Sequence, residues 1–201
     1  VKFNTGGGTK IPDQVLTYNE FVKEVDMPSR KGYEFNRWDF DFSTAITDDL
    51  VINAIWDVER FLVEFDTKTE DLIPFQLIEY GGKATPPPAP VKEGYTFVKW
   101  SFDFNSPVYS NILMDAVWEA NTYKVNYHAN GGTGSMIADS AQYDALFGAK
   151  KNTFTRVGYT FTGWNEKANG SGVAWSENPN GSWKWNYLND ITLYAQWKLN
   201  R

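Results

Sequence analysis

Apolar side chains alternate with polar or variable ones in short runs along this chain, and the clearest run occurs three times. In each copy every second position is apolar and the last residue is Trp. The three runs are Leu50, Ile52, Ala54 and Trp56, then Ile112, Met114, Ala116 and Trp118, then Ile191, Leu193, Ala195 and Trp197. Positions i, i+2 and i+4 of a β-strand lie on one face. Each run therefore predicts a strand that packs one face against a core.

A second motif precedes each of these strands, in which Gly is followed at fixed offsets by Tyr, Phe and Trp. Its copies are Gly32-Tyr33-Glu34-Phe35-Asn36-Arg37-Trp38, Gly94-Tyr95-Thr96-Phe97-Val98-Lys99-Trp100 and Gly158-Tyr159-Thr160-Phe161-Thr162-Gly163-Trp164. The Gly residues at 32, 94 and 158 are 62 and 64 residues apart, and a fixed period of this size indicates a tandem array of modules. We expect the Gly to form a turn where the strand begins. Tyr33 and Phe35 share a parity that Trp38 does not, so either both faces are covered or a bulge shifts the register.

Each module begins with a short alternating strand that ends in a turn. The strand carries two apolar residues two positions apart, which are Val1 and Phe3, Val63 and Phe65, and Val125 and Tyr127. The turn is Asn4-Thr5-Gly6-Gly7-Gly8 in the first copy and Asn130-Gly131-Gly132 in the third, and Gly and Asn tolerate positive φ. The second copy has Asp66-Thr67-Lys68-Thr69 at this place, which predicts a turn of another kind.

A second apolar segment follows, and beyond it the copies diverge. Leu16 and Tyr18 correspond to Ile78 and Tyr80, and Tyr143 takes the place of the Tyr in the third copy. Residues 19–25 are compatible with one or two helical turns. In the second copy Pro86-Pro87-Pro88-Ala89-Pro90 blocks a helix and favours a stiff, extended crossover. The alternative interpretation of this proline run is a ligand for a proline-reading domain.

The period divides the chain into three predicted modules, residues 1–58, 59–121 and 122–201. Modules of this length bury only about 60% of their chain surface, and the chain has no Cys and one His, so neither disulfides nor a structural metal is expected to support them. Aromatic residues make up 17% of the chain, and we expect them to form the cores. The expected core residues are Tyr33, Phe35, Trp38, Trp56, Tyr95, Phe97, Trp100, Trp118, Tyr159, Phe161, Trp164 and Trp197.

The links between modules are short, and the charge differs from module to module. Only four residues separate Trp56 from Phe61 and Trp118 from Tyr123, so we expect neighbouring modules to touch and to form a semi-rigid series. Acidic residues exceed basic ones by 10 to 6 in the first module and 10 to 5 in the second, while the third has 8 basic and 5 acidic. The first two would repel phosphate, so nucleic acid is not an expected partner.

The sequence predicts no membrane insertion within this segment, because no apolar run approaches 18 residues. The chain opens on Val1-Lys2 without an initiator Met or a signal-like segment. We therefore expect it to be a piece of a longer chain with adjacent domains.

The combination of these spaced elements resembles the Listeria–Bacteroides repeat, the B repeat of internalins. The resemblance covers essentially the whole chain and is closest in the third copy, which has Asn130-Gly131-Gly132, the complete Gly-Tyr motif and Thr192-Leu193-Tyr194-Ala195-Gln196-Trp197. It implies a mainly β (α+β), β-grasp-like module with at most a short helix. It further implies tandem copies in large secreted or wall-anchored bacterial proteins, often adhesins or invasion-associated. It brings no catalytic residue, cofactor or metal.

The third module contains a Trp-rich insertion. From Trp164 to Trp197 there are 33 residues, against 18 between the corresponding Trp residues of the other copies. The additional residues lie within 165–190 and include Trp175, Trp183 and Trp185. One interpretation is an exposed aromatic platform for a glycan or protein partner. The other is an extra hairpin whose Trp residues cover an open face of the sheet.

Other polar clusters are weaker candidates for chemistry. Asp39 and Asp41 lie two residues apart beside a Trp, as a glycosidase pair would, but the second copy has Ser101 in place of Asp39. A solvated strand face is the simpler interpretation. Asp48-Asp49 lack the spacing of a calcium loop, and His128 has no Ser or Asp partner evident in sequence.

The sequence therefore favours a non-catalytic repeat segment of a bacterial cell-surface or secreted protein. Its expected role is that of a stalk or spacer that also serves in adhesion or protein interaction, with a host-surface or cell-wall component, protein or glycan, as the expected partner. The alternative is a carbohydrate-binding module in residues 122–201 that uses the Trp platform.

Overall fold

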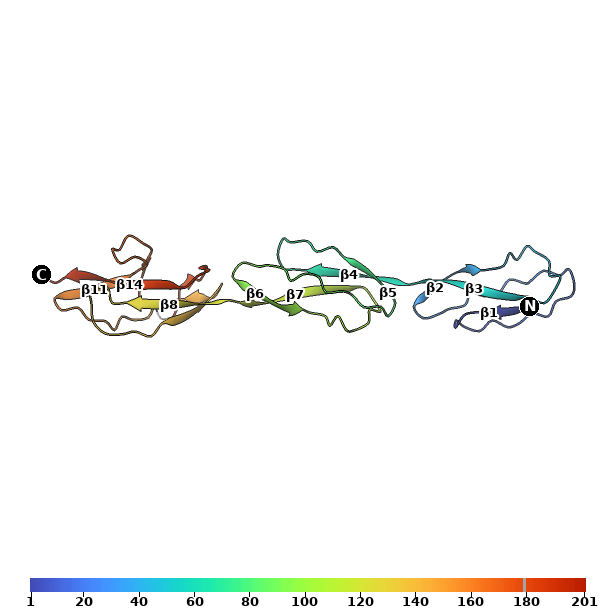
Figure 1. Ribbon diagram of the computed structural model, residues 1–201, viewed down its shortest axis with the longest axis horizontal. Coiled ribbons are helices and arrows are strands. Elements are labelled where there is room, and N and C mark those ends of the chain that lie inside the picture. Colours follow the sequence, from blue (N-terminus) through green and yellow to red (C-terminus); the bar gives the residue numbers. More distant parts are fainter. Residues whose placement is uncertain (179) are drawn as a thin grey trace. The chain divides into compact units, whose positions relative to one another are not determined.

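The computed structural model describes residues 1–178 and 180–201. Within these residues the regular structure is all β-strand and no helix occurs, which confirms the prediction of mainly β modules. Contacts divide the chain into two compact units, one made of Val1–Pro88 and Trp100–Asp115 and the other of Ala89–Lys99 and Ala116–Arg201. Figure 1 labels the main strands and colours them in chain order.

The first repeat forms a three-stranded sheet within the first unit. β3 (Val51–Val58) lies between β1 (Lys2–Asn4), which is parallel to it, and β2 (Tyr33–Trp38), which is antiparallel. The register between β2 and β3 shifts between Phe35 and Arg37. A bulge therefore accounts for the change of parity along the Gly-Tyr motif, and the same shift recurs in the third repeat between Phe161 and Gly163.

The second repeat has the strand order β5-β4-β7-β6. In the first unit β4 (Arg60–Asp66) lies between β5 (Gln76–Glu79), which is antiparallel, and the beginning of β7 (Ile112–Ala120), which is parallel. In the second unit the greater part of β6 (Tyr95–Trp100) runs beside the end of β7. There the ring centroids of Phe97 and Trp118 lie 5.6 Å apart.

The third repeat lies in the second unit and has the largest sheet. Its order is β12-β11-β14-β8-β9, with the bounds Thr122–His128 for β8, Asp139–Gln142 for β9, Tyr159–Asn165 for β11, Ala174–Trp175 for β12 and Ile191–Leu199 for β14. A separate antiparallel pair is formed by β10 (Leu146–Phe147) and β13 (Trp183–Lys184). β12 and β13 come from the insertion, so the insertion adds one short strand to the main sheet and one to this pair.

All three repeats pair their first and last strands in parallel. β1 pairs with β3, β4 with β7 and β8 with β14. Parallel neighbours need a crossover, and here each crossover contains the remaining strands of the repeat, joined by irregular chain. The apolar face of each alternating run packs inward as predicted, because Ile52, Met114 and Leu193 have no exposed surface.

The prediction that residues 19–25 form helical turns is wrong. Phe21 makes an isolated antiparallel bridge with Ala45, and the Ile46 backbone N–H donates to the Glu20 carbonyl at 2.7 Å. The Gln14 side chain donates to the carbonyl of Lys23 and accepts its N–H, both at 2.9 Å. These partners satisfy backbone groups of the segment in a non-helical conformation, so a helix would have to give them up.

The expected aromatic core is only partly enclosed. Among its twelve residues, Trp100 and Trp164 are buried and the other ten are half-buried. The rings still pack closely, with Phe35 edge-on to both Trp38 and Trp56 and Phe161 edge-on to both Trp164 and Trp197. Most of the fully buried side chains are aliphatic, and Trp164 and Trp185 join them in the third repeat.

Candidate functional site

The junctions between successive repeats are built from the same pair of backbone hydrogen bonds. A single residue separates the last strand of one repeat from the first strand of the next, Glu59 at the first junction and Asn121 at the second. The Glu59 N–H donates to the Gly32 carbonyl at 3.0 Å, and its own carbonyl accepts the Tyr80 N–H at 2.8 Å. At the second junction Asn121 bonds Gly94 at 2.9 Å and Tyr143 at 2.8 Å in the same way.

An aromatic ring packs directly on the glycine at each of these junctions. A Cβ added to Gly32 would lie 2.3 Å from Cδ1 of Tyr80, and one added to Gly94 would lie 2.3 Å from Cδ1 of Tyr143. The glycines have φ of +79° and +75° and both are buried. Only Gly allows this backbone conformation without strain and this approach of a ring. Each junction therefore lies inside one of the two compact units and is closely packed.

The two junctions differ in the groups that surround the tyrosine. At the first junction Tyr80 contacts Tyr109, with ring centroids 4.9 Å apart. At the second, Asp144 accepts a hydrogen bond from the Tyr95 hydroxyl at 2.7 Å and pairs with Lys184 Nζ at 2.9 Å. The hydrogen bond from Lys184, followed by that from Tyr95, lowers the pKa of Asp144. The first junction thus depends on aromatic packing, and the second adds an exposed polar network.

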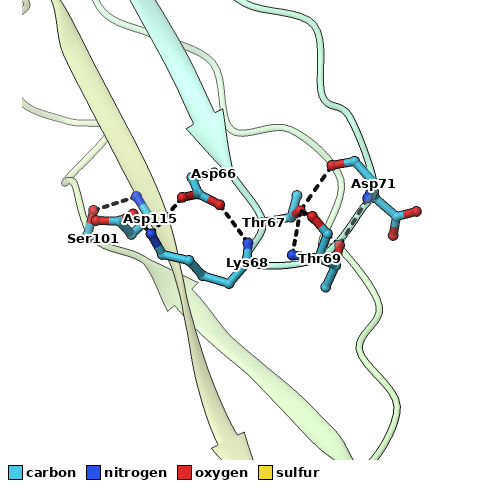
Figure 2. Close-up of polar contacts among 7 residues, drawn as sticks. All are labelled: Asp66, Thr67, Lys68, Thr69, Asp71, Ser101 and Asp115. Atoms are coloured by element: carbon cyan, nitrogen blue, oxygen red, sulfur yellow. Dashed lines mark hydrogen bonds and ion pairs between the residues drawn. The ribbon is translucent and has the colours of Figure 1, made fainter.

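The turn that lacks Asn-Gly-Gly in the second repeat is held by a lysine between two aspartates (Figure 2). Asp66 and Asp115 are direct partners on the parallel strands β4 and β7. Lys68 Nζ lies 2.6 Å from Asp66 Oδ2 and 2.6 Å from Asp115 Oδ1. In the first repeat the corresponding strand partners, Asn4 and Asn53, bond to each other without a charge.

The rest of this turn is a chain of hydroxyl contacts. Thr67 is buried, and its hydroxyl donates to the Asp71 carbonyl at 3.0 Å and contacts the Thr69 hydroxyl at 2.8 Å. Lys68 itself has φ of +56°, and its N–H donates to Asp66 Oδ1 at 2.8 Å. Side-chain oxygens therefore stabilise a left-handed lysine here, where the first repeat has Gly6 and the third has Asn130, with φ of +57° and +49°.

The three Trp residues of the insertion do not form a shared exposed platform. Trp175 and Trp185 are buried, with 4% and 0% of their surface exposed, while Trp183 is 47% exposed. Trp175 and Trp185 both lie edge-on to Phe147. The insertion thus closes part of the third core with two rings and leaves one ring at the surface.

A carboxylate joins three separate parts of the insertion. The indole N–H of Trp175 and the hydroxyl of Tyr187 both donate to Oε1 of Glu166. Burial, followed by the hydrogen bond to Glu166, raises the pKa of Tyr187 to about 12, so the hydroxyl keeps its proton at neutral pH. The indole N–H of Trp185 donates to the Tyr187 carbonyl at 3.0 Å.

The remaining polar candidates are hydrogen-bonded within the first and third repeats. Asp39 accepts the backbone and side-chain N–H groups of Asn53, both at 2.7 Å. Asp41 accepts the N–H and hydroxyl of Ser43, and these bonds lower the pKa of Asp41. His128 Nδ1 accepts the Asn130 N–H at 3.0 Å. Among residues 1–178 and 180–201, no group of three or more His, Cys, Asp or Glu side chains is placed to hold a metal ion.

The first repeat also carries an open apolar groove that sequence reasoning did not identify. Its volume is about 480 Å³, and it lies between the crossover and the inner face of β2. The lining residues are Val22, Glu24, Val25, Met27, Phe35, Trp38 and Phe42. Trp38 is half-buried beside this groove, whereas the corresponding Trp164 of the third repeat is 1% exposed.

Comparison with known proteins identifies the family. The model of the Listeria–Bacteroides repeat domain matches residues 1–54, 61–113 and 123–196. The chain therefore belongs to the Listeria–Bacteroides repeat family and contains three tandem copies. No helix in the described residues is of a length and apolarity that could cross a membrane.

Three curated relatives place these repeats in larger proteins. The chain is 29% identical to a putative membrane protein of Evansella cellulosilytica over all of its own length and 33% of the relative's. It is 27% identical to a putative Gly-rich membrane protein of the same organism, over 90% of the chain and 23% of the relative. It is also 27% identical to internalin H of Listeria monocytogenes, over 92% of the chain and 33% of that protein. The chain thus spans a third or less of these relatives.

Alanine at Gly94 is expected to destabilise the chain more than alanine at Gly158. Both glycines have nearly the same positive φ, +75° and +78°, so both substitutions incur the left-handed strain of about 1–2 kcal/mol. Only Gly94→Ala also drives a Cβ into Tyr143, which adds roughly 1–3 kcal/mol of overpacking. Urea unfolding followed by Trp fluorescence measures both losses. Equal losses would contradict the packing described at the second junction.

Replacing Lys68 by Met is expected to lower the melting temperature at pH 7, with the difference from the wild type shrinking in acid. The hydrogen bond from Lys68 lowers the pKa of Asp66, so its stabilisation is present above the unfolded-state pKa of about 3.9 and is lost as pH falls through the lower folded-state value. In the variant, acid also relieves repulsion between Asp66 and Asp115. Calorimetry between pH 7 and pH 2 tests this, with exposed Lys83→Met as the control. A difference that stays constant with pH would contradict the lysine's role.

Proposed function

We propose that this chain is a non-catalytic spacer segment of a bacterial cell-surface or secreted protein. The observation that carries the proposal is the repeated junction, in which one linking residue bonds both neighbours and a tyrosine packs on a buried glycine. A junction of this kind restricts how two repeats move against each other, because bending it would separate the ring from the glycine and break two hydrogen bonds. Restricted junctions between small modules are what a segment needs to hold other domains apart.

The location and partners follow from the same reasoning. Relatives of this chain are named as membrane proteins and as an internalin, which supports placement at the cell surface, outside the membrane. Adhesion or binding of a host-surface or cell-wall component is a second part of the proposed role. The groove of the first repeat and the exposed Trp183 are the described surfaces that favour a bound partner. No reaction is proposed, since Asp39 accepts hydrogen bonds from Asn53 of β3 and Asp41 accepts them from Ser43 of its own turn.

The distance between two spin labels tests whether the second junction restricts the movement of its two repeats. The chain has no Cys, so labels can be attached at Lys99→Cys and Lys151→Cys, two exposed positions on either side of this junction in the second unit. We expect a narrow distance distribution that broadens in Tyr143→Ala. The control is Tyr18→Ala, which removes a tyrosine that is 74% exposed and should leave the distribution unchanged. A broad distribution in the wild type would refute the spacer proposal.

Glycan binding at the insertion is the second candidate function, and one observation favours it. Trp183 is 47% exposed, and its ring centroid lies 5.6 Å from that of the buried Trp175, which fixes it at the surface. The proposed glycan site thus consists of the Trp183 ring alone, without Trp175 and Trp185. A fixed, exposed aromatic ring is suited to stack on a sugar.

A fluorescence titration of the full chain with cell-wall polysaccharides and glycosaminoglycans tests this candidate. If Trp183 binds a sugar, the Trp emission changes saturably, and Trp183→Ala reduces the affinity about tenfold or more, in line with a loss of at least 1.4 kcal/mol. Leu188→Ala, at another exposed apolar residue of the insertion, should have no effect. A flat titration, or one that Trp183→Ala leaves unchanged, would remove the glycan candidate and leave the spacer proposal standing.

A further inference from the structure

The end of the third repeat has the glycine side of a junction, but no tyrosine ring packs on it. The Asn200 N–H donates to the Gly158 carbonyl at 2.8 Å, just as Glu59 bonds Gly32 and Asn121 bonds Gly94. Gly158 has φ of +78°, but no heavy atom lies within 4 Å of a Cβ built on it, and it is exposed where Gly32 and Gly94 are buried. The glycine thus has the junction conformation without the ring.

The surroundings of Gly158 match the second junction in detail. The Thr160 hydroxyl donates to Asn200 Oδ1 at 2.6 Å, as the Thr96 hydroxyl donates to Asn121 Oδ1 at 2.6 Å. A cation lies over the following tyrosine in both places, Arg156 over Tyr159 at 3.9 Å and Lys92 over Tyr95 at 4.3 Å. The groups that would receive a tyrosine are therefore already held in position.

We propose that this surface, formed by Gly158, Tyr159 and Asn200, is a docking site for the tyrosine of a further repeat joined in series after Asn200. The argument is continuity with the two junctions of the same chain, where the tyrosine that ends the second segment of one repeat packs on the glycine of the repeat before it. The incoming N–H would bond the Asn200 carbonyl, as Tyr80 bonds Glu59 and Tyr143 bonds Asn121. An aspartate after that tyrosine would accept the Tyr159 hydroxyl, as Asp144 accepts that of Tyr95.

The occupant is thus a repeat of the same family whose second segment ends in Tyr. The site does not favour a separate partner, because both described junctions bring the ring into place through a single linking residue. An intramolecular ring has a high effective concentration that a free partner lacks. This inference rests on the proposed spacer function, since it extends the same kind of junction by one step.

The test is a four-repeat protein made by joining residues 122–201 directly after Asn200 of the full chain. This joint reproduces the natural Asn121–Thr122 sequence. In the three-repeat chain, Gly158→Ala should show only its conformational strain. In the four-repeat protein, the same change in the original Gly158 should reduce the folding equilibrium constant by a further factor of about 5–30, which is the effect expected from the ring contact in Gly94→Ala.

A double-mutant cycle separates docking from strain. Changing the appended copy's tyrosine, the counterpart of Tyr143, to Ala should return the cost of Gly158→Ala to its three-repeat value. An identical cost of Gly158→Ala in both proteins would overturn the proposal. Sedimentation of the three-repeat chain covers the other occupant, since association in trans that Gly158→Ala abolishes would mean that a second copy, and not a repeat in series, fills the site.

The spin-label measurement keeps this result separate from the proposed function. If the Lys99–Lys151 distribution is narrow but the cycle shows no coupling, the spacer proposal survives and the docking site is refuted. If that distribution is broad, the spacer proposal fails whatever the cycle shows.

Discussion

The contact between a tyrosine ring and a glycine with positive φ is the constraint on which the arrangement of these repeats depends. Each repeat is small and has a shallow aromatic layer, and over the three repeats together ten of the twelve expected aromatic core residues are half-exposed. Neighbours that contact one another supply burial that a module of this size lacks. The glycine serves two repeats at once, because it immediately precedes the edge strand of its own sheet and contacts a tyrosine of the next repeat. A side chain at this position would disturb both.

The three copies keep this architecture while they vary its parts. The turn after the first strand uses glycine in two copies, and in the second a buried threonine and a lysine set between two aspartates. The sheet edge ends at the Gly-Tyr strand in the first two repeats, but in the third it gains a two-residue strand and two buried Trp rings. The turn and the sheet edge therefore vary more among the copies than the parallel pair of strands does. A binding function is more easily altered at those two places.

Much of the fold follows from the sequence because alternation at Ile52, Met114 and Leu193 directly marks a buried face. The bulge after Phe35 was one of two predicted explanations for the change of parity. The non-helical path of residues 19–25 was not predictable, since it depends on bonds to Gln14 and to the distant Ile46. Likewise, the correspondence of Tyr80 and Tyr143 indicated a shared position but not its role, because the glycine that each ring contacts belongs to the preceding repeat. The number of Trp residues in the insertion was plain, but their burial depends on Phe147 from another element.

The parallel pairing of the first and last strands has a mechanical consequence. The chain enters a repeat at the start of its first strand and leaves at the end of its last, and these strands lie side by side in the same direction. A pull on the two ends of a repeat is then directed along the strands and across their hydrogen bonds. Such a load shears the whole ladder at once and does not open it one bond at a time. Each repeat is thus connected in the orientation in which a small sheet best resists tension.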